Sequence, residues 1–278
     1  MPHGIFETVS RMKKEIAMEY SKASVVSVRE IAPSIYDMLL KAPGIAKEAR
    51  PGQFICLYSE DSAHLLPRPI SICEVFPDHV RLVFRIAGYG TKELSLKKEG
   101  ETVTVLGPIG NGYPEFESGK SITVVGGGIG IPPMLYLARK LHENGNEVNV
   151  VLGYRDAGLF LNEAFAGYGK VYIATDDGSV GYHGNVVGLI ETEKLPVDTV
   201  CACGPMPMLK GLAAYTEANG GKAYISLEER MACGVGACLG CITKTKETDG
   251  HSHVKNKRIC TEGPVFDSSE LDFGGAKR

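Results

Sequence analysis

Four cysteines near the C-terminus have a spacing suited to metal ligation. They are Cys233, Cys238, Cys241 and Cys260. The first three follow the pattern C-x4-C-x2-C and the fourth comes after a longer insert, which is the plant-type ferredoxin arrangement for a [2Fe–2S] cluster. Thiolates converge on two irons only if the backbone wraps closely around them, and small residues allow that approach. The segment supplies Gly234, Gly236 and Gly240. The predicted chemistry is the transfer of single electrons.

Zinc is the main alternative to an iron–sulfur cluster as the metal bound by these cysteines. Structural zinc sites usually consist of two C-x2-C pairs, or of Cys and His pairs, whereas this chain has one C-x2-C. His251 and His253 could complete a zinc set with Cys260, but that set leaves surplus thiols. The spacing therefore favours the cluster. Three further cysteines lie in apolar, strand-like runs and are expected to be small buried side chains, namely Cys56, Cys73 and Cys201.

Composition limits the class of protein. The chain has 278 residues, 44% of them hydrophobic, and a formal net charge of -3. This length suits two domains, or two domains and a small appendage. The near-neutral charge gives no electrostatic reason to expect nucleic acid or an anionic membrane as a partner. No apolar run approaches the roughly 18 residues of a spanning helix. The N-terminus lacks the apolar core of a signal peptide, and eight cysteines in a chain of this length do not indicate a secreted disulfide framework. We therefore expect a cytoplasmic protein.

Residues 24–106 show the alternation typical of short β-strands. Val26 and Val28 alternate with polar neighbours, as do Tyr36, Met38 and Leu40. Further strands are predicted at residues 53–58, 70–75, 80–87 and 102–106, separated by Pro-Gly, Pro-Asp and Glu-Gly dipeptides. Short strands at this spacing indicate a small antiparallel barrel.

The pattern changes near residue 120. Strands are predicted at residues 121–125, 147–153, 170–175, 199–203 and 223–227, and helices at 133–144 and 207–219. Alternating strands and helices predict a parallel sheet covered by helices. From residue 228 onwards the chain is rich in Gly and Cys.

The expected fold class is therefore multi-domain, with a β part, an α/β part and a small C-terminal cluster domain. We expect an N-terminal extension at residues 1–22, an antiparallel β-barrel at 23–113, a parallel-sheet domain at 114–228 and the cluster domain at 229–278. In the extension, a short amphipathic helix or a frayed segment is predicted from the helical spacing of Ile5, Val9, Met12 and Ile16.

Two short motifs lie in the predicted barrel. Arg68, Pro69, Ile70 and Ser71 begin a strand, although an edge strand often starts with proline for purely structural reasons. Residues 85–91 form a glycine-containing turn that ends in Thr91, and its backbone N–H groups can face a pyrophosphate. Each motif alone is also compatible with an ordinary strand or hairpin turn. Their presence in one small barrel ahead of an α/β domain favours a binding site.

Two further motifs follow strands of the predicted parallel sheet. The run G-G-G-I-G-I-P-P at residues 126–133 comes directly after the first strand, where glycines let a phosphate approach the backbone and the following helix adds partial positive charge. It is not the G-x-G-x-x-G fingerprint, and a plain strand-to-helix turn is the alternative. Cys203 ends the fourth strand and begins C-G-P-M-P-M. Both motifs lie at the carboxyl edge of the sheet, where open α/β sheets bind ligands.

In this order and spacing, the motifs R-P-I-S, G-x-G-T, G-G-G-I-G-x-P-P and C-G-P-x-P-M resemble the ferredoxin reductase superfamily, over about residues 24–228. That superfamily combines an FAD-binding barrel with a nicotinamide-nucleotide domain. The tail is more specific, because E-x-R-M-A-C-G-x-G-A-C-x-x-C followed by C-x-x-G-P-V-F is similar to the electron-transfer subunit of class 1B dihydroorotate dehydrogenase. D-D-G-S at residues 176–179 and G-P-x-G-N-G at 107–112 match it too.

The resemblance implies roles for individual residues of the barrel. Arg68 would face the flavin pyrophosphate and Ser71 would lie near the isoalloxazine N5, with Pro69 and Ile70 also lining the flavin. The ribityl and phosphate region would be bordered by Arg85, Ile86 and Ala87. The pyrophosphate would be bound by Gly90 and Thr91.

The resemblance also implies how the other two sites are used. The nicotinamide nucleotide would be received by Gly127, Gly128, Gly130 and Pro132. Cys203 would lie close to the nicotinamide ring, and the four C-terminal cysteines would hold the cluster. Hydride transfer between a nicotinamide and a flavin needs stacking and close contact, so we expect no acid–base residue. Glu228 and Glu229 are interpreted as solvated or charge-tuning groups.

NADH gives up two electrons at once, whereas a cluster accepts one. A flavin between them would connect two-electron transfer to one-electron transfer. Oxidation of dihydroorotate needs a base, an anion pocket and its own flavin, and no residues remain for them here. We therefore expect another polypeptide to handle the organic substrate. In the resembling family the partner is an FMN-containing β/α barrel, two of each chain assemble, and electrons run from dihydroorotate through FMN, the cluster and FAD to NAD⁺ in pyrimidine biosynthesis.

Other functions remain open at this point. The runner-up is the small subunit of a bifurcating NAD(P)H–ferredoxin oxidoreductase, a group that often carries Asp where Cys233 stands. A self-contained flavin reductase serving an oxygenase is a third possibility, and a zinc-stapled, non-enzymatic interaction module is a fourth. Arg155 after the second sheet strand suits a 2′-phosphate, but the adjacent Asp156 opposes one, so NAD is favoured over NADP.

Overall fold

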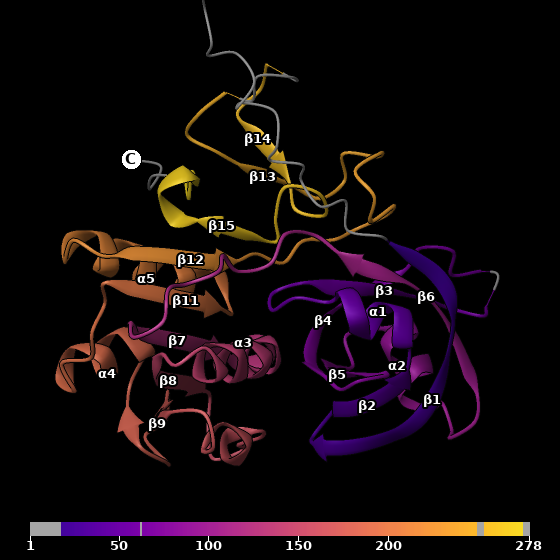
Figure 1. Ribbon diagram of the computed structural model, residues 1–278, viewed down its shortest axis with the longest axis horizontal. Coiled ribbons are helices and arrows are strands. Elements are labelled where there is room, and N and C mark those ends of the chain that lie inside the picture. Colours follow the sequence, from indigo (N-terminus) through magenta and orange to yellow (C-terminus); the bar gives the residue numbers. More distant parts are fainter. Residues whose placement is uncertain (1–17, 62, 249–252, 275–278) are drawn as a thin grey trace, which may run out of the picture.

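The computed structural model describes residues 18–61, 63–248 and 253–274. A barrel and a helix-covered sheet lie side by side, and the C-terminal segment lies across both of them (Figure 1). The predicted helix at residues 5–16 lies outside the described residues. Within the described ranges, none of the helices combines the length and apolar character needed to cross a membrane.

The first part of the chain forms a closed barrel in the order β1-β2-β5-β4-β3-β6. All its strand pairs are antiparallel. The strands are β1 (Glu19–Ala32), β2 (Ile35–Lys41), β3 (Phe54–Tyr58), β4 (Arg68–Val75), β5 (His79–Arg85) and β6 (Thr102–Ile109). Two short helices, α1 (Pro43–Glu48) and α2 (Tyr89–Ser95), complete it. This confirms the antiparallel barrel that the alternating pattern predicted.

Strand β3 of the barrel is buried on both of its faces. Ile55 and Leu57 pack in the barrel core, whereas Phe54 and Cys56 belong to a different apolar cluster that includes Cys241 and Cys260. Side chains alternate between the two faces of a strand. The outward face of β3 is therefore buried by the C-terminal segment.

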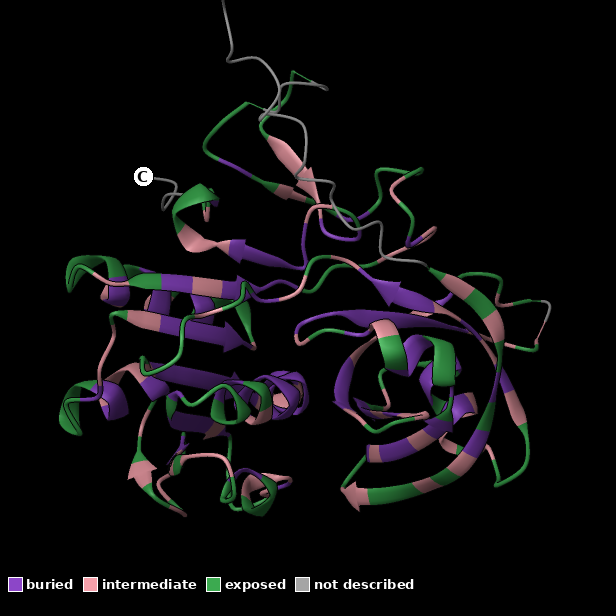
Figure 2. Cartoon of the chain, in the orientation of Figure 1, coloured by how far each residue is buried: buried purple, intermediate pink, exposed green. Residues whose placement is uncertain are grey.

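The second part is a sheet of order β10-β9-β8-β7-β11-β12-β15. Its strands are β7 (Ser121–Gly127), β8 (Glu147–Tyr154), β9 (Lys170–Thr175), β10 (Tyr182–His183), β11 (Thr199–Cys203), β12 (Lys222–Ser226) and β15 (Val265–Asp267). The helices are α3 (Ile131–Glu143), α4 (Val186–Thr192) and α5 (Met206–Ala218), with 3-10 turns η1 (Gly128–Gly130), η2 (Asn162–Phe165) and η3 (Ser268–Glu270). The central strands are buried on both faces (Figure 2), which explains their continuous apolar runs. The predicted parallel sheet is confirmed.

The C-terminal segment is joined to both neighbours. Hairpin strands β13 (Ile242–Lys244) and β14 (Asn256–Arg258) project from the molecule, while β15 pairs antiparallel with β12. At the other end of the chain, β1 begins at Glu19, inside the predicted N-terminal extension. The domain limits given above therefore stay a prediction.

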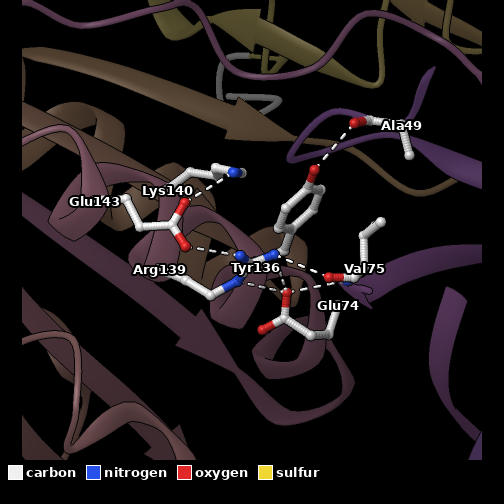
Figure 3. A network of polar contacts seen from close by, with 7 residues as sticks. All are labelled: Ala49, Glu74, Val75, Tyr136, Arg139, Lys140 and Glu143. Atoms are coloured by element: carbon white, nitrogen blue, oxygen red, sulfur yellow. Dashed lines mark hydrogen bonds and ion pairs between the residues drawn. The ribbon is translucent and has the colours of Figure 1, made fainter. Parts of the chain in front are cut away.

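A polar network fixes the barrel against α3 (Figure 3). Arg139 on α3 forms an ion pair of 2.8 Å with Glu74 on β4, and it donates a second hydrogen bond of 3.0 Å to the Val75 carbonyl. The Glu74 side chain is 6% exposed. One turn away, the Tyr136 hydroxyl donates to the Ala49 carbonyl at 3.0 Å. These contacts hold the two parts in a fixed relation.

We expect Arg139→Ala to lower the free energy of unfolding by about 3 kcal/mol, because it leaves the buried Glu74 carboxylate without its cation. Lys140→Ala is the matched control: Lys140 pairs with Glu143 on the exposed face of the same helix, and such pairs contribute about 0–1 kcal/mol. Urea unfolding of the two variants measures the difference. Equal losses of stability would contradict a structural role for the Arg139–Glu74 pair.

Candidate functional site

A cavity of about 810 Å³ lies where the barrel, the sheet and the C-terminal segment meet. From the barrel it is lined by most of the motif residues, namely Arg68, Pro69, Ile70, Ser71, Arg85, Ala87 and Thr91. From the sheet side it is lined by Ile129 in η1 and by residues 226–231 after β12. The structure thus gathers motifs that are far apart in the sequence around one space.

Pro69 and Ser71 of the barrel motif share the outward face of β4, while Ile70 packs against the barrel core. Ser71 lies opposite Phe54 and Pro69 lies opposite Cys56 across the β3–β4 pair. Arg68 extends over the first turn of α2, since a Cβ on Gly90 would lie 2.2 Å from Arg68 Nε. A side chain at position 90 would therefore displace the guanidinium.

Two residues of the barrel motifs do not line the cavity. The Ile86 N–H donates a hydrogen bond of 2.9 Å to the Ser34 carbonyl, and Gly90 is covered by Arg68. The Thr91 hydroxyl, although it borders the cavity, accepts the N–H groups of Ala87 at 2.9 Å and Gly88 at 3.2 Å. Thr91 thus shapes the turn.

The glycine motif of the sheet is packed against Cys203. A Cβ on Gly130 would lie 2.4 Å from the Cys203 carbonyl oxygen, so only glycine fits there. Gly128 has a φ of +53° and its Cβ position lies 4.0 Å from Arg85 Nη2. Gly127 ends β7, and Pro132 lies in the first turn of α3. The motif therefore faces the barrel across the edge of the cavity, where η1 meets Arg85.

Glu228, which the sequence analysis interpreted as a solvated or charge-tuning group, lines the cavity. Its side chain keeps solvent-accessible surface toward the cavity, yet the surrounding protein desolvates the carboxyl and raises its pKa, against the opposing effect of Arg85. Glu228 also helps to raise the pKa of the buried Cys203 thiol, after burial itself. Its position just after β12, at the carboxyl edge of a parallel sheet, was the available signal.

The four C-terminal cysteines approach one another as two pairs. The Cys233 thiol lies near that of Cys238, and the Cys241 thiol lies near that of Cys260. Cys238 is exposed, whereas Cys241 and Cys260 are buried. In the described ranges, no set of three or more His, Cys, Asp and Glu side chains converges as a single-ion site.

The backbone around Cys233 favours a negatively charged sulfur at that position. Although burial opposes it, hydrogen bonds from the N–H groups of Val235, Cys238 and Ala237, together with the Cys238 thiol, lower the pKa of Cys233 to about 7. The loop can turn its amides inward because Gly234 and Gly236 have φ values of +69° and +82°. A donor set of two thiol pairs within such a loop fits a thiolate-held iron–sulfur cluster.

The cavity and the cysteine loop are adjacent along the chain. Met231 lines the cavity two positions before Cys233. The G-P-x-G-N-G segment secures the loop from the barrel side, because the Asn111 side chain donates to the carbonyls of Thr261 and Glu262 at 3.1 Å each. The two candidate sites are therefore held next to each other by both ends of the C-terminal segment.

Comparisons with known proteins agree with this arrangement. A family model described as the iron-sulfur cluster binding domain of dihydroorotate dehydrogenase B matches residues 228–272. Two relatives are the dihydroorotate dehydrogenase B (NAD(+)) electron transfer subunits of Shouchella clausii, 42% identical over 90% of this chain and 97% of that protein, and of Bacillus cereus strain B4264, 41% identical over 91% and 99%.

Solved structures show the same fold. The NADH-dependent reduced ferredoxin-NADP oxidoreductase aligns with a TM-score of 0.81 and 30% identity, covering 90% of both chains. A ferredoxin NADP⁺ reductase from Neisseria gonorrhoeae with bound FAD and NADP aligns with a TM-score of 0.61 at 16% identity, covering 76% of this chain and 94% of that one.

A closed antiparallel barrel joined to a parallel sheet, with a cavity between them, defines a ferredoxin-reductase-like oxidoreductase. The cysteine loop that follows the sheet distinguishes one family within this class. The chain belongs to the family of electron transfer subunits of dihydroorotate dehydrogenase B. The resemblance seen in the motifs is thereby confirmed.

Proposed function

We propose that this chain transfers electrons between the catalytic subunit of dihydroorotate dehydrogenase B and NAD⁺, using FAD and a [2Fe–2S] cluster. One observation carries the proposal: a single cavity is bordered by the barrel motif, by the glycine turn and by the segment that leads into the cysteine loop. When bound, the flavin exchanges two electrons with the nicotinamide and one with the cluster. This chain's residues bind these groups and hold them in sequence.

The proposed flavin site is the cavity. Arg68 and Arg85 supply positive charge for a pyrophosphate, while Pro69, Ile70, Ser71, Ile86, Ala87, Gly90 and Thr91 shape the surrounding wall and turn. The proposed nicotinamide site is the adjoining edge of the sheet, at Gly127, Gly128, Gly130, Pro132 and Cys203. Asp156, whose carboxylate accepts the Gly158 N–H at 2.8 Å, adds negative charge after β8 and favours NAD over NADP.

The proposed cluster ligands are Cys233, Cys238, Cys241 and Cys260. Two exposed apolar side chains lie close in sequence to the exposed Cys238, with Leu239 62% exposed and Val235 41% exposed. Leu239 also has a φ of +57°, an uncommon conformation for a side chain of its kind. A strained, exposed leucine beside an electron-transfer thiol marks a contact surface. We assign this surface to the catalytic subunit, which in our proposal holds FMN, acts in the cytoplasm and assembles as two of each chain.

The purified chain is expected to reduce dyes with NADH but to show no turnover with dihydroorotate. Adding the catalytic subunit restores NAD⁺-linked oxidation of dihydroorotate, because the organic substrate is handled there. Spectrophotometric assays of both reactions make the measurement. Turnover of dihydroorotate by this chain alone would refute the division of labour.

The same assay locates the contact surface. Leu239→Glu is expected to leave NADH–dye activity intact and to weaken NAD⁺-linked dihydroorotate oxidation at limiting catalytic subunit. Leu96→Glu serves as the control, since Leu96 is 67% exposed but lies after α2 in the barrel. Equal effects of the two substitutions would place the partner elsewhere.

Glu228→Gln is expected to raise the FAD midpoint potential at high pH. Because the pKa of Glu228 is raised above its usual value, the carboxyl is neutral below that pKa and acts like glutamine. Above it, the carboxylate disfavours the electron-rich flavin. The difference from wild type therefore opens as pH rises, to about 30 mV for an interaction of ~1.4 kcal/mol. Spectroelectrochemical titration at several pH values measures it, with Glu147→Gln at the far end of β8 as control. A pH-independent difference would contradict this role for Glu228.

A further inference from the structure

A fifth cysteine lies directly beneath the cluster loop. Cys56 belongs to β3 of the barrel and its side chain is fully buried, with 0% exposure. A Cβ built on Gly234, the residue after the first ligand, would lie 3.0 Å from Cys56 Sγ. Cys56 also shares one apolar cluster with Cys241 and Cys260. A thiol from the barrel wall thus contacts the loop that carries the proposed ligands.

The position of Cys56 along β3 places it between the two cofactor sites. Phe54, two residues earlier on the same outward face, lines the flavin cavity. Pro69, the residue opposite Cys56 on β4, lines the cavity as well. Directly opposed residues of an antiparallel pair have Cβ atoms about 5 Å apart. Cys56 therefore lies between the barrel motif, through its pairing with Pro69, and the cysteine loop, through its contact with Gly234.

The Cys56 side chain is fully buried among apolar side chains, and such burial favours the neutral thiol over the thiolate. A protonated thiol is a weak hydrogen-bond donor. In a wall made otherwise of apolar side chains such as Ile109, it is a polar hydrogen that faces the cluster loop.

We propose that Cys56 is a positioning residue of the cluster, which does not ligate iron but donates its S–H to a cluster sulfur or ligand thiolate and thereby raises the reduction potential of the cluster. Hydrogen bonds to the sulfurs stabilise the more negative, reduced state and are a main determinant of cluster potential. This inference rests on the proposed function, because it takes the cluster to be held by the four C-terminal cysteines.

The test is an EPR-monitored redox titration of the FAD- and cluster-loaded protein, comparing wild type with Cys56→Val, Cys56→Ala and Cys56→Ser. Valine and alanine remove the donor, so we expect the equilibrium constant for cluster reduction to fall about threefold to tenfold, the upper limit being ~59 mV for a one-electron couple. Serine keeps a donor and should hold the potential at or above the wild-type value. Cys73→Val is the matched control, a fully buried thiol of the adjacent strand that packs toward the sheet instead.

A second readout is independent of the potential. Pulsed EPR of the reduced cluster after exchange into D₂O should detect one exchangeable hydrogen in wild type that is absent in Cys56→Val and Cys56→Ala. Unchanged potentials and unchanged hydrogen couplings in both variants would overturn the proposal. Loss of iron from Cys56→Val would also overturn it, because it would make Cys56 a ligand. A wild-type protein without a cluster signal would instead refute the proposed function itself.

Discussion

Cys238→Ser is expected to remove the iron–sulfur cluster and to leave FAD bound. Cys238 is exposed at the tip of the loop and its sulfur is reached by the Gly240 N–H at 3.4 Å, so the side chain contributes little to the packed core. A serine hydroxyl is a much poorer ligand for iron than a thiolate. The substitution also leaves Cys233 without its neighbouring thiol. The loading of FAD should stay unchanged because Cys238 is not among the residues that line the cavity.

Iron and acid-labile sulfide analysis, EPR of the reduced protein and the FAD-to-protein ratio measure this outcome. Cys73→Ala is the control, since it removes a fully buried thiol of the barrel that packs away from the loop. It should keep both cofactors. An unchanged EPR signal in Cys238→Ser would show that the ligand set has been assigned wrongly. Loss of FAD together with the cluster would show that the loop is needed to close the cavity.

Much of the fold follows from local patterns, because barrel strands such as β1 and β6 alternate along their length and the central sheet strands are largely apolar. Strand β15 could not be predicted in this way. Its residues carry no strong strand pattern, and their conformation is set by pairing with Tyr224, Ile225 and Ser226 across a separation of about forty residues. Helix α4 was missed because it is short and contains Gly188; the N-cap Asn185 was the available signal.

In the candidate site, too, some features follow from local sequence and others from contacts between distant segments. The C-x4-C-x2-C spacing indicated the first three proposed ligands, which lie in one short segment, and Cys260 was added as the cysteine that follows the insert. The environments of Glu228 and Cys56 depend instead on which surfaces meet. The pKa of Glu228 is raised because the folded protein around the cavity desolvates its carboxyl, against the opposing charge of Arg85, and Cys56 becomes a neighbour of the cluster loop only when Gly234 packs on β3. An apolar run around Cys56 gives no sign of that contact.

Arg68→Ala is expected to weaken the retention of FAD by about 10- to 100-fold. The Arg68 guanidinium lies over Gly90 at the mouth of the cavity, and its Nη1 donates to the Leu66 carbonyl, so it is held in place before any ligand binds. Hydrogen bonds to charged groups contribute about 1.5–3 kcal/mol each, which sets the expected range. FAD retention by Arg68→Lys should lie between that of wild type and that of Arg68→Ala, because lysine keeps the charge but cannot form the paired contacts of a guanidinium.

The FAD-to-protein ratio after serial dilution and gel filtration gives the measurement. Arg29→Ala is the control for the loss of a cation from the same barrel, since Arg29 is largely exposed and pairs with Asp37 on β2, away from the cavity. The cluster should remain in all three variants because the cysteine loop does not contact Arg68. Full FAD occupancy in Arg68→Ala would mean that the flavin is not bound by this motif. In that case the cavity between barrel and sheet would have to be assigned to the nicotinamide nucleotide alone.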